Sequence, residues 1–240
     1  MSKCRRVFSG AIGLLVMFMF LGSSGLAGQE KTEVNVKTDA SGVEADGAVG
    51  QAALAAEMAA YGYAEKAPLA LVSAARIVIA QAVDVVDRDK ESEGGEEGEA
   101  KSGGVDVSLD AEKLLADAEE MAAGDEVIVE LIGRVRQEAV TVTRGRVGGP
   151  ASHYDEVLAR TTDVYTMSFR GGEWAEIRVR GDGDTDLDCY VYDQNGNLID
   201  SDTDYTDYCI LGWVPRWTGS FTLRIQNLGW VWNGYILVTN

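Results

Sequence analysis

The sequence predicts an α+β protein of two domains, an N-terminal antiparallel helical bundle of αα-hairpins followed by a C-terminal antiparallel β-sandwich. Apolar residues repeat at helical spacing up to about residue 138, and a period of two replaces that spacing further on. All five tryptophans lie beyond residue 173. We therefore expect a helical domain at 50–138, a linker at 139–150 and a sandwich domain at 151–240.

The first 27 residues have the anatomy of a secretory signal peptide. A basic start precedes an apolar run at residues 11–21, and small residues follow up to Ala27. We expect cleavage after Ala27, because the run is shorter than the roughly 20 residues of a membrane span; an uncleaved anchor is the alternative. No later segment is apolar for long enough to cross a bilayer, which predicts a periplasmic or secreted protein without a membrane span after cleavage.

Two segments predict little fixed structure. Residues 28–49 are polar, Gly-rich and aperiodic, which is typical of a flexible leader. Residues 87–104 hold five glutamates among glycine and serine. Like charges and glycine oppose packing, so we expect a solvated acidic loop there.

Four helices are expected between these segments and the linker. The Ala-rich stretch from Gln51 favours the first helix, and Pro68 suits the first turn of the second, whose apolar pattern runs to Val86. Ser108 or Asp110 can cap a third helix, and Asp125 begins a fourth.

Short strands with regular turns follow the linker. Apolar residues alternate with polar ones around Ile177, Val191 and Leu223. Asn195-Gly196 is the strongest hairpin signal, because both residues tolerate positive φ. Seven or eight such strands predict an antiparallel sandwich.

Cysteine usage predicts one disulfide. Cys4 leaves with the signal segment, so Cys189 and Cys209 remain in the exported chain. Two thiols in an oxidising compartment favour a bond between them. The alternative is a pair of buried free thiols that pack as small apolar groups.

Clustered aspartates are the candidate metal ligands. Calcium binds about six to eight oxygens, which carboxylates on loops can supply. The alternative is a solvated acidic rim that keeps the protein soluble. The candidate calcium ligands are Asp182, Asp184, Asp186, Asp188, Asp200 and Asp202.

Aromatic residues near the C-terminus are the candidate ligand-binding surface. Tryptophan side chains can stack on a sugar or a peptide, although in a small sandwich they more often fill the core. The four candidates are Trp213, Trp217, Trp230 and Trp232.

Charge and composition exclude several function classes. The net charge of −18 is opposite to the clustered basic residues that bind nucleic acid, so we expect no nucleic-acid partner. His153 is the single histidine and no nucleophile–base set accompanies it, so no catalytic residue is assigned and no cofactor is required. A glycosidase using two carboxylates is the least favoured alternative.

Residues 181–199, which include the run Asp182 to Asp188 and the Asn195-Gly196 turn, resemble the centre of the bacterial pre-peptidase C-terminal domain. Residues 217–225 resemble its aromatic-Gly-strand element, and the likeness covers about 145–240. The resemblance implies a jelly-roll-like sandwich found on secreted proteins, in a family where some relatives bind calcium or extracellular matrix. This chain departs from that pattern, because no peptidase domain precedes the sandwich.

The expected function is that of an exported, non-catalytic bacterial protein, in which a helical interaction domain joins a binding or scaffolding sandwich. Its expected partner is a protein or a glycan in the envelope or outside the cell. One alternative is a calcium-stabilised adhesion or carbohydrate-binding module. A second alternative is an accessory protein of a secreted hydrolase system.

Overall fold

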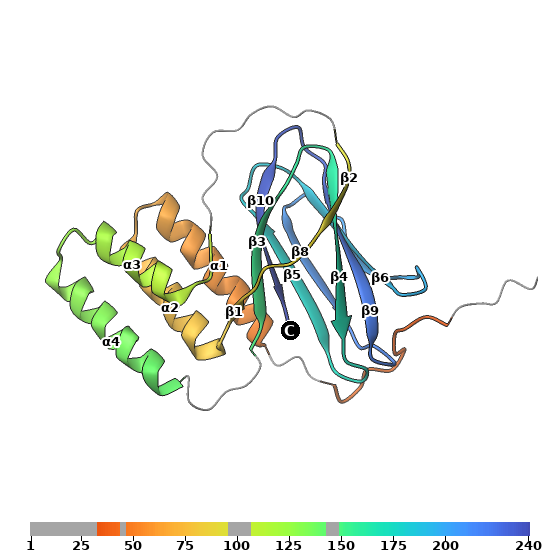
Figure 1. Ribbon diagram of the computed structural model, residues 1–240, viewed down its shortest axis with the longest axis horizontal. Helices are drawn as coiled ribbons and strands as arrows, with labels where there is room; N and C mark the ends of the chain where they lie inside the picture. Colours follow the sequence, from red (N-terminus) through yellow and green to blue (C-terminus); the bar gives the residue numbers. More distant parts are fainter. Residues whose placement is uncertain (1–32, 44–46, 96–106, 143–148) are drawn as a thin grey trace, which may run out of the picture. The chain divides into compact units, whose positions relative to one another are not determined.

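The structure is a computed structural model that describes residues 33–43, 47–95, 107–142 and 149–240 (Figure 1). The expected signal peptide lies outside the described residues, as do parts of the predicted leader, acidic loop and linker. Within residues 33–240, which form one compact unit, the described segments contain helices and two sheets, so the predicted α+β class is confirmed.

The described helices are α1 (Ala48–Ala64), α2 (Pro68–Gln81), α3 (Ala111–Met121) and α4 (Glu126–Val142). Pro68 occupies the first turn of α2, where its missing N–H costs no hydrogen bond. The Asp110 side chain accepts a hydrogen bond from the backbone N–H of Lys113 at 2.7 Å and caps α3. Helix α2 contacts each of the other three, so its apolar surface is the centre of their packing.

Two five-stranded sheets face each other (Figure 1). Every pairing is antiparallel except that of β1 with β3. The first sheet has the order β1-β3-β10-β5-β8, and the second has the order β2-β4-β9-β6-β7. The strands are β1 (Asp84–Val85), β2 (Glu91–Gly94), β3 (Ala151–Val157), β4 (Thr161–Phe169), β5 (Ala175–Gly181), β6 (Leu187–Asp193), β7 (Leu198–Asp202), β8 (Tyr208–Trp213), β9 (Gly219–Asn227) and β10 (Asn233–Thr239).

The predicted hairpin at Asn195-Gly196 is confirmed. It joins β6 to β7, with Gly196 at a φ of 78°. The Asp193 carboxylate accepts hydrogen bonds from the backbone N–H groups of Asn195 and Asn197, each at 2.9 Å. This side chain therefore fixes the turn from its first residue.

Strand β10 belongs to two apolar cores at once. Tyr235 and Leu237 point into the core between the sheets, whereas Ile236 and Val238 pack with the residues of the helices. All four are at most 5% exposed. Because successive side chains of a strand point to opposite faces, this one strand joins the helices to the sandwich.

The segment that follows α2 differs from the prediction. The helical pattern was expected to run to Val86, but α2 ends at Gln81, and β1 and β2 form where a helix end and a solvated loop were expected. Both strands are sheet edges, and their residues are exposed. Charged edge strands resist pairing with other chains, which explains an acidic sequence in a strand.

The predicted flexible leader also contains an anchored residue. Asn35 is 0% exposed, and its side chain binds the backbone of Trp217 on both sides, as acceptor at 3.0 Å and donor at 3.1 Å. Its backbone N–H donates to Asp193 at 2.9 Å. The Asn35 amide thus bonds to both the N–H and the carbonyl oxygen of Trp217, as a neighbouring strand would. This part of the leader is therefore packed against the sandwich.

Candidate functional site

A partly open pocket of about 430 Å³ lies where α1 meets the ends of β5 and β10. Helix α1 supplies Glu57 and Tyr61, and the sandwich supplies Tyr154 and Arg180. The remaining wall comes from small or apolar groups and two aspartates: Ala56, Ala60, Ala64, Val107, Gly181, Asp182, Asp184, Gly234 and Ile236. The three alanines of α1 leave this space open between the longer side chains of Glu57 and Tyr61.

One ion pair in the pocket wall links the helix to the sheet. Arg180 of β5 lies 3.5 Å from the Glu57 carboxylate, with both side chains more than a third exposed. Such a pair contributes little to stability, on the order of 0.5 kcal/mol. The Nε of Arg180 is buried and has no hydrogen-bond partner among the described residues. One donor of this guanidinium is therefore left for an acceptor that the described chain does not supply.

Aromatic and acidic groups meet around Gly234, which lines the pocket. A Cβ added to Gly234 would lie 2.7 Å from the Tyr154 hydroxyl, 3.3 Å from the Asp182 carboxylate and 3.3 Å from the Trp232 ring. Glycine at this position lets these three groups approach the backbone. The Asp182 carboxylate also accepts the N–H of Gly234 at 2.9 Å, which fixes its direction.

The pocket lining is acidic overall. It contains Glu57, Asp182 and Asp184 against one cation, Arg180. Tyr61 adds an aromatic ring that is 60% exposed. The chain as a whole carries −18, so its field also favours positively charged ligands. An amphipathic cation is the chemistry that this lining fits best.

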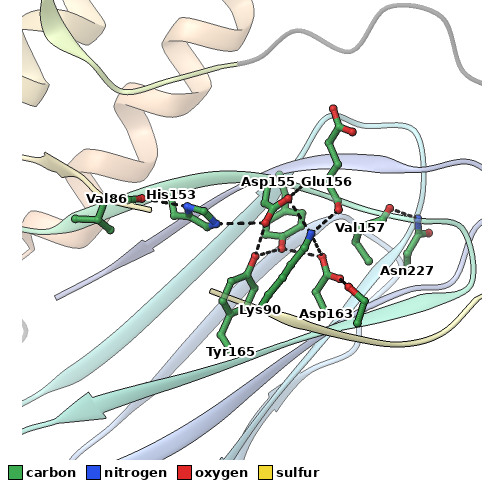
Figure 2. A network of polar contacts seen from close by, with 11 residues as sticks. Val86, Lys90, His153, Asp155, Glu156, Val157, Asp163, Tyr165 and Asn227 are labelled. Atoms are coloured by element: carbon green, nitrogen blue, oxygen red, sulfur yellow. Dashed lines mark hydrogen bonds and ion pairs between the residues drawn. The ribbon is translucent and has the colours of Figure 1, made fainter. Parts of the chain in front are cut away.

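A second polar site lies inside the sandwich, on the side of β2, β3 and β4. Figure 2 shows Lys90 between two aspartates, Asp155 of β3 and Asp163 of β4. Its ammonium lies 2.8 Å from Oδ1 of Asp155 and 2.8 Å from Oδ2 of Asp163, and it donates to the carbonyl oxygen of Glu156 at 2.7 Å.

Two buried tyrosines extend this polar network. Tyr165 donates to Asp155 at 3.2 Å, Tyr235 donates to Asp163 at 3.0 Å, and the two hydroxyls contact each other. Burial raises the pKa of both tyrosines well above the usual value, and the neighbouring aspartates add to the shift. Burial alone would raise the pKa of Asp155, but the bond from Lys90 and further hydrogen bonds hold it below its usual value. Both tyrosines are therefore neutral donors at neutral pH.

His153 stands at the margin of the network and has no nucleophile beside it. Its Nδ1 lies 3.0 Å from the carbonyl oxygen of Val86, and its Nε2 lies 3.4 Å from Asp155. The side chain is 8% exposed. Sequence reasoning set His153 aside and did not single out Lys90, Asp155 or Asp163. The sequence did contain one signal for this site. Asp163 falls at an inward-facing position in the alternation of β4, where an apolar residue is expected.

The predicted calcium ligands do not converge on one point. Asp200 and Asp202 of β7 accept the backbone N–H groups of Gly212 and Ile210, each at 2.9 Å. Their carboxylates therefore join two edge strands from different sheets. Among the described residues, no group of three or more His, Cys, Asp and Glu side chains is arranged to hold a metal ion.

The other predicted ligands lie on and before β6. Asp182 binds Gly234 as described above, and Asp184 is exposed in the same loop. Asp188 is 9% exposed and accepts a hydrogen bond from Tyr190 at 3.0 Å. Asp186 is different, because its Oδ1 is buried without a hydrogen-bond partner among the described residues. Burial raises its pKa, and the nearby carboxylates of Asp188, Asp204 and Asp207 raise it further.

The four predicted aromatic ligands have different positions. Trp213 is 4% exposed and packs edge-on against Phe169 in the sandwich core, so its assignment to a ligand surface is wrong. Trp217 lies beneath Arg216, and Trp232 is partly buried beside Gly234. Trp230 is 61% exposed.

Arg160 covers the exposed ring of Trp230, with its guanidinium carbon 4.4 Å from the ring centroid. The same guanidinium donates to the carbonyl oxygen of Leu228 at 2.7 Å. The four tryptophans therefore do not form one binding surface.

The predicted disulfide between Cys189 and Cys209 is present. Cys189 belongs to β6 and Cys209 to β8, which lie in different sheets. The bond therefore joins the two layers directly. No described helix combines the length and the apolar character that a membrane span requires.

No protein-family model matches the chain, and no curated protein matches it. Among solved structures, the chain is similar to the pre-peptidase C-terminal domain of a collagenase from Bacillus anthracis, with 11% sequence identity and a TM-score of 0.23. The similarity covers 39% of this chain and 81% of that chain. At this TM-score the similarity supports no statement about function.

Proposed function

We propose that this chain is an exported, non-catalytic binding protein that holds a positively charged segment of a partner protein in the pocket between α1 and the sandwich. The observation that carries the proposal is the pocket lining, in which three carboxylates and two tyrosines surround one arginine. Carboxylates attract a cation, and tyrosine rings bind its aliphatic stem and its charge. The disulfide supports a location in the periplasm or outside the cell.

The guanidinium of Arg180, whose side chain is 37% exposed, supports a peptide rather than a simple cation. A lysine or arginine side chain of the partner would occupy the acidic side of the pocket. A backbone carbonyl of the same peptide would accept from the exposed part of the Arg180 guanidinium, since the Nε itself is buried. One extended basic segment would therefore satisfy both sides of the pocket.

The proposal is tested by titrating fluorescein-labelled tetralysine peptide into the full-length protein and following fluorescence anisotropy. We expect saturable binding that weakens at least tenfold in Tyr61→Ala and in Glu57→Gln, because each removes a pocket contact. Tyr205→Ala is the matched control, since Tyr205 is 97% exposed and does not line the pocket. Equal affinity in all four proteins contradicts the pocket assignment, and binding of glycans with no peptide binding favours the carbohydrate alternative.

The strand orders also support a finer description of the fold. From β3 to β10 the chain changes sheet at every step except one, the hairpin that joins β6 to β7. Such alternation is expected of a jelly roll made from two Greek keys. We propose this topology for the sandwich and an antiparallel bundle for the helices.

Calcium is the second candidate, and Asp186 is the observation that favours it. A carboxylate oxygen without a partner, beside three other aspartates, is stabilised by a cation. A calcium-stabilised adhesion module is therefore the alternative function.

A further inference from the structure

Lys90, Asp155 and Asp163 place an amine between two carboxyl groups in a largely buried site (Figure 2). The amine nitrogen lies 2.8 Å from an oxygen of each carboxylate. The side chain of Asp163 is 1% exposed and that of Lys90 is 21% exposed. One positive charge faces two negative ones here, so the site is electrostatically unbalanced and shielded from water.

Both oxygens of Asp163 accept hydrogen bonds from neutral donors. The Ser92 hydroxyl donates to Oδ1 at 2.7 Å, and the Tyr235 hydroxyl donates to Oδ2 at 3.0 Å. Two donors aimed at one carboxyl group draw electron density from its carbon. They are also placed to stabilise the negative charge that develops on these oxygens when a nucleophile attacks.

Asp155 is placed to move the protons. It contacts the same ammonium and is itself held by the Tyr165 hydroxyl at 3.2 Å and by the backbone N–H of Glu156 at 2.7 Å. These bonds remain when Lys90 loses its charge. A carboxylate within hydrogen-bond distance of an amine can act as its general base.

We propose that Lys90 and Asp163 join in an intramolecular isopeptide bond, and that Asp155 is the catalytic residue of this self-modification. Nucleophile, electrophile and base then belong to one chain and are brought together by folding. The proposal does not depend on the pocket or on its ligand.

The reaction balances without an oxidant, a reductant or a cofactor. Asp155 takes one proton from the Lys90 ammonium, and the neutral amine attacks Cγ of Asp163 to form the N–C bond. One carboxyl oxygen of Asp163 leaves as water, with the proton that Asp155 returns and a second proton from the nitrogen. The products are one amide and one water, and Asp155 ends as a carboxylate again.

Burial favours the product. Holding a charged pair away from water costs free energy, whereas an amide is neutral. The close approach also replaces a bimolecular encounter by an intramolecular one, which contributes greatly to rate. The bond would tie the residue preceding β2 to β4, and so secure an edge strand that backbone hydrogen bonds to β4 hold otherwise.

Peptide mapping of the exported full-length protein tests the proposal. The protein is reduced and alkylated, so that the disulfide cannot link peptides, and then digested with trypsin. We expect residues 89–101 linked to residues 161–170, without cleavage after Lys90, and a mass lower than the sum of the two peptides by one water, about 18 Da. Separate peptides with cleavage after Lys90 show an ion pair only and overturn the proposal.

Variants separate the roles of the three residues. Lys90→Arg keeps the charge and should abolish the linked peptide, and Asp155→Asn should lower its yield at least tenfold. An unchanged yield in Asp155→Asn contradicts the role of Asp155. Lys113 and Asp117 form the control pair, because they lie 2.9 Å apart but are 43% and 30% exposed, and their peptides should remain separate. Since the wild-type map alone decides whether the bond exists, a variant that fails to fold does not weaken the test.

Discussion

Aspartate side chains of the sandwich act mainly as acceptors for backbone N–H groups. Asp193 fixes a hairpin, and Asp200 and Asp202 replace the missing backbone pairing between two edge strands. Hydrogen bonds to a charged acceptor contribute more than neutral ones. The Asp-rich pattern that predicted a metal site therefore has a structural reason at Asp200 and Asp202.

Asp186 is the exception, and we expect Asp186→Asn to stabilise the protein. Burial and three neighbouring carboxylates raise the pKa of Asp186, so its ionised form destabilises the fold. Below the unfolded pKa of about 4 the substitution should have little effect. As the pH rises through the folded pKa the variant should become more stable, by about 0.5–1 kcal/mol at pH 7, measured by urea unfolding in EDTA.

The Asp186→Asn variant also tests whether calcium binds at these carboxylates. If a cation neutralises the same carboxylates, millimolar calcium raises the melting temperature of the wild type but not of Asp186→Asn. Asp87→Asn is the control and should keep the calcium response, because Asp87 is exposed and is not one of the candidate ligands. A wild type whose melting temperature is insensitive to both calcium and EDTA excludes the calcium alternative.

At the scale of elements, the open sides of the two sheets are closed by side chains. Strands β7 and β8 are joined through Asp200 and Asp202, while Lys90 lies beside β2 and contacts β3 and β4. Edge strands need such protection because their backbone groups lack partners on one side. Sequence periodicity does not report these links, since each joins strands that lie in different sheets.

The disulfide is the covalent part of this closure, and the double variant Cys189→Ala, Cys209→Ala measures it. The two cysteines are 20 residues apart, and a loop of that length corresponds to about 3 kcal/mol in the chain-entropy account. We expect a loss of that order in the free energy of unfolding, measured with guanidinium under oxidising conditions. Wild-type protein treated with a reductant is the control and should show a similar loss, whereas an unchanged midpoint in both contradicts a structural role.

For the whole molecule, the sequence predicted what depends on local patterns and missed what depends on contacts between distant segments. The helices, the alternating strands and the Asn195-Gly196 turn follow from period and turn chemistry. The acidic strand at Glu91 and the anchored Asn35 do not, because each is fixed by a partner elsewhere in the chain. Lys90 was missed for the same reason, since only folding brings it to Asp155 and Asp163.

Strand β10 makes the helices and the sandwich depend on each other, so we expect the described unit to unfold in one step. Ile236 is 5% exposed and belongs to the core formed by the helices, although β10 lies in the middle of the first sheet. Ile236→Ala should lower the stability of the whole unit by about 2–4 kcal/mol. Differential scanning calorimetry should show a single transition with equal calorimetric and van't Hoff enthalpies in wild type and variant.

Ile210→Ala is the control, since Ile210 is 46% exposed on β8 and should change stability by less than about 0.5 kcal/mol. Two separate transitions, of which the variant moves only the helical one, would show that β10 does not couple the two parts.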